Sequence, residues 1–310
     1  MKLLSAFAIA TLAIAGLTAC SSAPQAAACE MQAKSGKNTA AVKVSGQFGT
    51  KPTVDFTKGM TATDTQSLDV IKGTGRAVNA GESITIDAQL YDATSGQIIQ
   101  QTAYDGQSRP TIPVDVSKLG GFSKALICHK VGSRVVAVIG NDQTLATSLG
   151  LAKSATVVAV VDIVGANLSK ANGAPQPAVD GMPRVVLSDA GIPGITIPKS
   201  TAPSKLEVAL LKKGDGALVA EHANVTVHYI GVTWANATTP FDSSWSRGTP
   251  AEFNVDNVVE GFKQALVGQR VGSQVLAVIP PALGYKDQAA GSIPANSTLV
   301  FVIDILGTSK

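Results

Sequence analysis

The second half of the chain has a mostly strand-like pattern of apolar and polar positions. Segment 225–230 alternates apolar and polar residues with a period of two, as a half-buried strand does. β-Branched runs follow at 275–279 and 299–306, and the apolar run 206–211 precedes a Lys-Gly-Asp-Gly turn. Segment 257–266 instead spaces its apolar residues by three and four, and Gly268 lies just beyond it. The pattern predicts an antiparallel sheet wrapped over one short helix.

The chain repeats this pattern. Residues 121–139 align with 261–279 at an offset of 140, and residues 156–165 align with 298–307 at an offset of 142. A period of this length indicates a tandem domain duplication rather than a solenoid. We expect copies at 39–166 and 203–310, joined by a Pro-rich linker at 167–202. Within that linker, the apolar stretch in 183–197 is expected to add an edge strand to the second copy.

The N-terminus predicts export. Lys2 precedes the apolar run 3–15, which is too short to span a bilayer, and small residues follow it. The ending Leu-Thr-Ala-Cys at 17–20 resembles the bacterial lipobox, in which the cysteine is diacylated. We therefore expect a lipoprotein signal peptide at 1–19, a lipid-anchored polar stalk at 20–38, and attachment through Cys20 to the extracytoplasmic face of the cell membrane. The alternative is an ordinary signal peptide that contains a cysteine.

With Cys20 carrying lipid, two of the three cysteines remain, Cys29 and Cys128. In an oxidising compartment two remaining cysteines are expected to pair. The alternative is two unpaired thiols, because the sequence does not show whether their Cα atoms approach.

Composition excludes several classes of function. Hydrophobic residues make up 45% of the chain and charged residues 15%, as in a globular protein. The net charge of +3 is too weak to indicate a nucleic-acid partner. His129, His222 and His228 have no Cys or Glu at ligand spacing, so we expect no metal site. No nucleophile–base motif appears, and we expect no cofactor.

Ordered motifs fill the second copy: Val-His-Tyr-x-Gly at 227–231, Phe-Asp-Ser-Ser at 241–244, Gly-Phe at 261–262, Gly-Tyr at 284–285, Ile-Pro at 293–294 and Thr-Leu-Val-Phe at 298–301. In this order and spacing, nearly all of 203–310 resembles an FKBP-type peptidyl-prolyl cis-trans isomerase (EC 5.2.1.8). The resemblance implies an α+β fold with two tandem FKBP-like domains. Each would be an antiparallel half-barrel around one short α-helix, in agreement with the pattern above.

The resemblance also implies an apolar pocket. The expected catalytic residues are Tyr229, Phe241, Asp242, Tyr285 and Phe301, and the expected substrate-binding residues are Arg247, Val258, Val259, Phe262 and Ile293. Aromatic rings would hold the proline, and the Ile293 N–H and the Tyr285 hydroxyl would bind substrate carbonyls. A buried Asp242, held by Tyr229, would act electrostatically. Taken singly, each residue also fits an ordinary core or structural role.

Some positions depart from the family pattern. Phe262 replaces a common Trp, Ala251 replaces a common aromatic residue, and Lys286 replaces a usual Gly. These changes bear on substrate range and on affinity for macrolides more than on activity.

The first copy lacks most of the pocket. The offsets align Tyr229 with Ala88 and Phe301 with Ala159, while Phe241 and Asp242 align with Ile99 and Gln100; only Phe122, aligned with Phe262, survives. We expect this copy to keep the fold without catalysis.

The functional prediction is a surface-anchored isomerase that assists folding of exported proteins. Its expected partners are proline-containing exported polypeptides, the membrane and macrolide ligands, with no nucleic acid. The alternative is a non-catalytic chaperone or adaptor that holds secreted clients.

Overall fold

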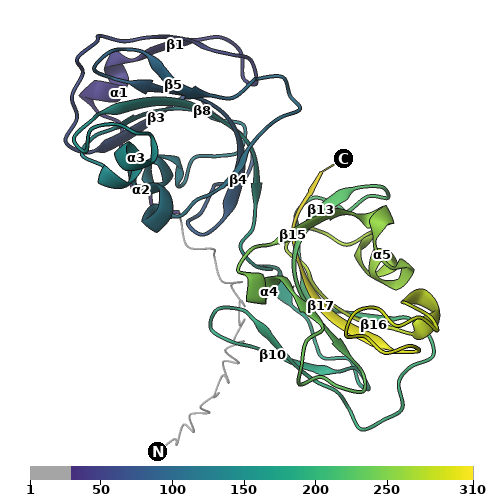
Figure 1. Ribbon diagram of the computed structural model, residues 1–310. Coiled ribbons are helices and arrows are strands. Elements are labelled where there is room, and N and C mark those ends of the chain that lie inside the picture. The colour runs from purple at the N-terminus through teal and green to yellow at the C-terminus, as the bar shows by residue number, and fades with distance from the viewer. Residues whose placement is uncertain (1–28, 310) are drawn as a thin grey trace, which may run out of the picture.

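The computed structural model describes residues 29–309, which form two lobes (Figure 1). The predicted signal peptide and Cys20 lie outside the described residues. Within residues 29–309, none of the helices is both long and apolar enough to cross a bilayer.

Each lobe is built on an antiparallel sheet, and the two sheets share one strand order. The first runs β3-β7-β8-β4-β5 with β6 beside β4, from Thr65–Ile71, Arg134–Ile139, Val157–Asn167, Ser83–Asp92, Ile98–Gln101 and Thr111–Pro113. The second runs β12-β16-β17-β13-β14 with β15 beside β13, from Glu207–Lys213, Gln274–Ile279, Leu299–Ser309, Asn224–Thr233, Asp242–Ser243 and Ala251–Asn254. The register shift between Asp69 and Ile71 recurs between Leu210 and Lys212. The sequence repeat therefore corresponds to a repeat in topology, bulges included.

Short helices lie against the sheets. The first lobe has α1 (Lys37–Ala41), α2 (Val116–Leu126) and α3 (Gln143–Ser148); the second has α4 (Ser244–Arg247), η1 (Val255–Asn257), α5 (Glu260–Leu266) and η2 (Pro281–Leu283). The helix expected at 257–266 is shorter than predicted, because Val258 and Val259 are extended, with ψ of 169° and 144°. Gly268 follows α5 with φ of 85°, a left-handed conformation that favours glycine.

Both faces of each sheet are covered. One face packs on the long helix of its lobe, around Phe122 in the first and Phe262 in the second. The other face of the first sheet is covered by the N-terminal segment with β1 (Lys43–Ser45) and β2 (Thr53–Asp55). In the second lobe the hairpin of β10 (Arg184–Leu187) and β11 (Pro193–Thr196) takes that place. This double coverage explains why β7, β16 and most of β17 are buried at every position, with mostly apolar residues rather than an alternating pattern.

The segment expected as a linker contains ordered structure. The edge strand expected within 183–197 is wrong in detail, because β10 and β11 pair with each other and lie across the sheet. The short β9 (Ala174–Pro175) pairs with the edge strand β12 instead. At the junction of the lobes, Leu168 N–H donates to Leu306 O at 2.9 Å, and Ala171 N–H donates to Asp304 at 2.8 Å. Hydrogen bonds therefore fix the start of this segment on the second lobe.

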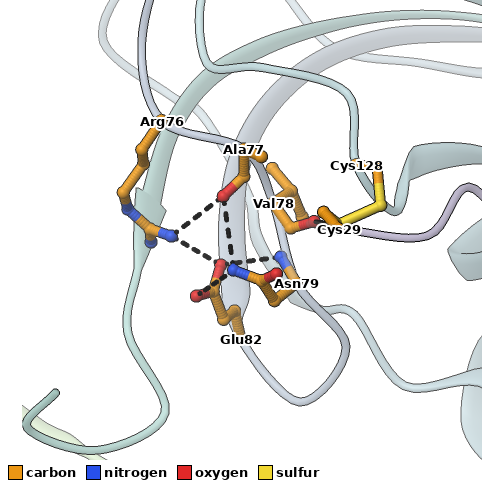
Figure 2. Close-up of a disulfide and its surroundings, with 7 residues drawn as sticks. All are labelled: Cys29, Arg76, Ala77, Val78, Asn79, Glu82 and Cys128. Carbon is orange, nitrogen blue, oxygen red and sulfur yellow. Dashed lines mark hydrogen bonds and ion pairs between the residues drawn. A yellow bond between two sulfur atoms is a disulfide. The ribbon is translucent and has the colours of Figure 1, made fainter. Parts of the chain in front are cut away.

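A disulfide joins Cys29 to Cys128, with Cα atoms 5.5 Å apart (Figure 2). The bond ties the first described residues to the loop after α2. Beyond it, Ser67 N–H donates to Lys34 O at 3.2 Å, and Ala33 is 2% exposed. The described part of the segment expected as a stalk therefore packs on the first lobe instead of extending freely.

Candidate active site

The sequence motifs of the second lobe converge on one pocket. Its volume is about 650 Å³, within the range of about 300–1,000 Å³ that suits small-molecule and peptide ligands. It is lined by Tyr229, Phe241, Asp242, Phe253, Asn257, Val258, Val259, Phe262, Tyr285, Ala290, Gly291, Ser292, Ile293 and Phe301. All the expected pocket residues except Arg247 are in this lining.

Three phenylalanines form the floor. Phe262 from α5 meets Phe301 from β17 edge to face, with ring centres 4.9 Å apart and planes at 87°. Phe241 meets Phe301 in the same way at 5.4 Å. Gly231 makes this possible, because a Cβ there would lie 2.6 Å from Phe241 and 2.7 Å from Phe301. The glycine of the Val-His-Tyr-x-Gly motif is therefore required for ring packing.

A hydrogen-bonded trio forms one wall. The Tyr229 hydroxyl donates to one oxygen of Asp242, and Arg247 donates to the other. Arg247 also donates to the Tyr229 hydroxyl at 3.2 Å and lies 5.7 Å from the centre of its ring. The three residues come from β13, β14 and α4, which places a charged group beside the aromatic floor.

Asp242 is not buried as the sequence suggested, since its side chain is 41% exposed and that of Arg247 is 48% exposed. Partial burial tends to raise the pKa of Asp242, but the hydrogen bonds from Tyr229 and Arg247 bring its pKa below the usual value. Burial, together with the bond to Asp242, raises the pKa of Tyr229. Asp242 is therefore an anion and Tyr229 a neutral donor at neutral pH.

His228 supports the trio from the opposite side of β13. Its Nδ1 lies 2.9 Å from Ser244 Oγ, which accepts the Tyr229 N–H at 2.8 Å. Its ring stacks on Trp245 at 4.0 Å. Burial lowers the pKa of His228 to about 4. As the neighbour of Tyr229 on β13, His228 points to the opposite face of the strand, and its bonds anchor the backbone of Tyr229.

The expected backbone donor is engaged elsewhere. Ile293 N–H donates to Ala290 O at 3.0 Å, and the reverse bond closes a tight turn. Val259 lines the pocket just before α5, and its N–H has no acceptor among residues 29–309. Tyr285 is 40% exposed at the rim, and its hydroxyl has no partner within the same range. Val259 N–H and the Tyr285 hydroxyl are therefore available to donate to substrate carbonyls.

Sequence reasoning missed Phe253, which packs on Phe262 with ring centres 5.5 Å apart. Phe253 stands two residues after Ala251 on β15, so both side chains point to one face. That period-two relation was the available signal. Lys286, in the place of a usual glycine, keeps a left-handed backbone with φ of 58°.

The first lobe lacks this chemistry. In the first sheet Ala88 pairs with Val161, as Tyr229 pairs with Ile303 in the second. Likewise Leu90 pairs with Gln100, as Gly231 pairs with Asp242. Ala88 and Gln100 therefore occupy the places of Tyr229 and Asp242. The positions of the Tyr229 hydroxyl and the Asp242 carboxylate are thus held by a methyl group and an amide. A smaller cavity of about 230 Å³ remains.

The first lobe does contain a hydrogen-bonded Ser–His–Asp triad that the sequence analysis did not predict. Ser67 Oγ lies 3.0 Å from His129 Nε2, and His129 Nδ1 lies 2.7 Å from Asp69. Ser67 is only 2% exposed, and its hydroxyl also lies 3.3 Å from Ala33 O. A buried hydroxyl bonded to the backbone cannot reach a substrate, so the triad is structural. Residues 29–309 contain no His, Cys, Asp and Glu cluster suited to a metal ion.

Comparison with known proteins identifies the family. A family profile described as FKBP-type peptidyl-prolyl cis-trans isomerase matches residues 216–306. A probable FK506-binding protein of Corynebacterium glutamicum is 33% identical over 114 residues, which are 37% of this chain and 96% of that protein. An FK506-binding protein of Streptomyces anulatus is 35% identical over 118 residues, covering 37% and 94%. The FKBP-type 22 kDa peptidyl-prolyl cis-trans isomerase of Escherichia coli is 43% identical over 104 residues, covering 33% and 50%.

The profile match falls within the second lobe and spans the aromatic floor, the Tyr229–Asp242–Arg247 trio and the Val259 donor. The relatives from Corynebacterium and Streptomyces are matched over nearly their whole length. The chain belongs to the FKBP-type peptidyl-prolyl cis-trans isomerase family.

Proposed function

We propose that the second lobe catalyses cis-trans isomerisation of X-Pro bonds in exported polypeptides. The observation that carries this proposal is the pocket itself, in which an aromatic floor, the Asp242 carboxylate and the Val259 N–H, unpaired among the described residues, meet. No group in the pocket is arranged as a nucleophile with its base. The site therefore suits a reaction that needs neither a covalent intermediate nor proton transfer.

The barrier to rotation about a peptide bond is about 18–20 kcal/mol, because resonance gives the C–N bond double-bond character. Resonance separates charge, so a mostly apolar site weakens it. A site that fits the twisted amide better than either planar form lowers the barrier by binding the transition state.

Each part of the pocket has a role in this mechanism. The rings of Phe241, Phe262 and Phe301 hold the proline ring while the carbonyl before it rotates. Val259 N–H and the Tyr285 hydroxyl bind the flanking carbonyls and fix the backbone. Asp242, oriented by Tyr229 and Arg247, acts on the rotating carbonyl carbon through its negative charge.

We further propose that the chain consists of two tandem FKBP-like domains, whose repeated cores are the expected 39–166 and 203–310, and that only the second is catalytic. The shared strand order supports the first statement, and the replacement of Tyr229 and Asp242 by Ala88 and Gln100 supports the second. The same replacement favours an alternative in which the chain acts as a chaperone or adaptor.

The experiment is an isomerisation assay on a short X-Pro peptide, using the chain from Ser21 to Lys310. Phe262→Ala and Phe122→Ala form a matched pair, since the two rings are equivalent and are 4% and 5% exposed. Each costs about 3–5 kcal/mol of stability in its own lobe. We expect Phe262→Ala alone to abolish most activity. Equal losses would contradict catalysis confined to the second lobe, and no activity in the folded parent chain would favour the chaperone alternative.

We also propose that Cys20 carries lipid and holds the protein on the extracytoplasmic face of the cell membrane. The Leu-Thr-Ala-Cys motif supports this. Cys20→Ser should move the protein from the membrane fraction to the soluble fraction and abolish metabolic labelling with palmitate. Macrolide binding at the second-lobe pocket is a related proposal, supported by its volume of about 650 Å³. Inhibition of the assay by tacrolimus tests it.

A further inference from the structure

The first lobe has its own cavity at the place that corresponds to the candidate active site. Phe122 from α2, equivalent to Phe262, lies at its base, and Ala88 from β4 takes the place of Tyr229. Leu119 and Leu149 form walls, and Ser148 from α3 stands at the rim. The loss of catalysis has left an apolar cavity here, not a filled core.

The size of the cavity limits what it can hold. An apolar cavity of about 150 Å³ is large enough to bind benzene. The volume of about 230 Å³ therefore admits one aromatic ring or one large aliphatic side chain. It falls below the range of about 300–1,000 Å³ that is typical for drug-sized ligands. Helix α3 accounts for the smaller volume than in the second lobe, because Leu145 on α3 and Leu149 just after it line the cavity.

The rim is uncharged and includes an open sheet edge. Strand β5 pairs with β4 on one side and with no other strand in the described part of the chain. Thr102 N–H donates to Ala88 O at 2.9 Å, so by alternation the Gln101 N–H and C=O point away from β4. Unpaired edges of this kind accept extended peptides, with specificity supplied by adjacent side-chain pockets.

Gln100 gives the rim a second means of peptide recognition. It stands where Asp242 stands in the second lobe, and its amide has no side-chain partner among residues 29–309. An amide both donates and accepts hydrogen bonds, as a peptide backbone requires, and it carries no charge. The rim thus fits a neutral extended chain better than an ion.

We propose that the first lobe binds an unfolded polypeptide segment, inserting one aromatic or large aliphatic side chain into this cavity while the backbone of the segment pairs with β5. Proline is not required at this site. The bound segment is not isomerised, because no aromatic cradle or carboxylate acts on it.

The test uses the chain from Ser21 to Lys310 and a fluorescent, proline-free probe, acetyl-Lys-Thr-Val-Thr-Phe-Thr-Val-Thr-Lys-amide, followed by anisotropy. We expect saturable binding. A probe with Ser in place of Phe, and a probe N-methylated at alternate residues, should each bind about tenfold or more weakly. Absence of saturable binding up to about 1 mM would overturn the proposal, as would equal binding of all three probes.

Two exposed neighbours on α3 provide matched protein variants. Ser148 lines the cavity and Thr147 does not. Ser148→Trp should block the entrance and weaken the probe about tenfold or more, whereas Thr147→Trp should change its affinity less than about twofold. Melting curves of both show whether the fold is kept.

Tyr285→Ala, at the rim of the second pocket, separates this proposal from catalysis. It should lower isomerase activity and leave probe binding intact. Loss of probe binding with Tyr285→Ala, together with unchanged binding in Ser148→Trp, would place the probe in the second lobe and refute the inference.

Discussion

Replacing Val259 by proline removes one hydrogen-bond donor from the pocket without disturbing the backbone. Val259 has φ of −61° and ψ of 144°, which proline adopts without strain. The preceding Val258, at φ −118° and ψ 169°, is extended, as a residue before proline prefers. The Val259 N–H has no partner among the described residues, so the substitution breaks no hydrogen bond of the fold.

The expected magnitudes follow from these facts. A proline that fits its site stabilises a protein by about 0.4–1 kcal/mol through the unfolded state, which offsets the lost contacts of the valine side chain. The melting temperature should therefore stay within about 4 °C of the parent. A hydrogen bond to a neutral carbonyl contributes about 0.5–1.5 kcal/mol. At about 1.4 kcal/mol per tenfold change, kcat/KM should fall roughly two- to twelvefold.

The assay is isomerisation of an X-Pro peptide, with Val259→Ala as the control. Both variants lose the isopropyl group, so the ratio of their kcat/KM values isolates the N–H. Val259→Pro should be the slower of the two. Equal kcat/KM values would refute the role of the Val259 N–H. The substrate carbonyl would then have to bind the Ile293 N–H, which would first have to leave its bond to Ala290.

Three further outcomes are expected. Tyr229→Phe should cost about 1 kcal/mol of stability and lower activity, because the Tyr229 hydroxyl bridges a partly exposed ion pair. Tyr285→Phe should lower activity without a loss of stability. Melting curves recorded beside the isomerisation assay distinguish the two effects. Reduction of the Cys29–Cys128 bond should destabilise the first lobe by about 2–4 kcal/mol and leave isomerase activity unchanged, as calorimetry with and without reductant would show. Between pH 6.5 and about 4, His228, whose pKa in the folded protein is about 4, takes up a proton mainly in the unfolded state. Stability should therefore fall from pH 6.5 towards 4, and His228→Gln should flatten that slope in pH-dependent melting.

The motif order of the second lobe, through its resemblance to the isomerase family, predicted which of its side chains meet. Tyr229 and Phe301 lie on β13 and β17, and Phe241 lies just before β14; their meeting in one pocket was expected from the family motifs. The alignment of Asp242 with Gln100 agrees with the register, in which Gln100 lies opposite Leu90 as Asp242 lies opposite Gly231.

Features that depend on backbone hydrogen bonding could not be predicted in this way. The hydrogen bond from Ile293 N–H to Ala290 depends on a tight turn, and the residue types at positions 290–293 do not predict that turn. The β10–β11 hairpin covers a sheet face because that face is apolar, but its few β-branched residues among prolines predict only a short strand. The exposure of Asp242 depends on how α4 presents Arg247, which spacing alone does not reveal.

The junction between the lobes determines how two sites on one chain act on one client. The hydrogen bonds from Leu168 to Leu306 and from Ala171 to Asp304 restrict the motion of the chain where the lobes join. A polypeptide held at β5, as proposed, would reach the second pocket by an intramolecular step, so its effective concentration there would not depend on how much protein is present. Such a step raises the overall affinity only when the spacing between the two sites can be bridged. The proposed binding would therefore favour prolines at a set distance along the client from the side chain that the first lobe holds.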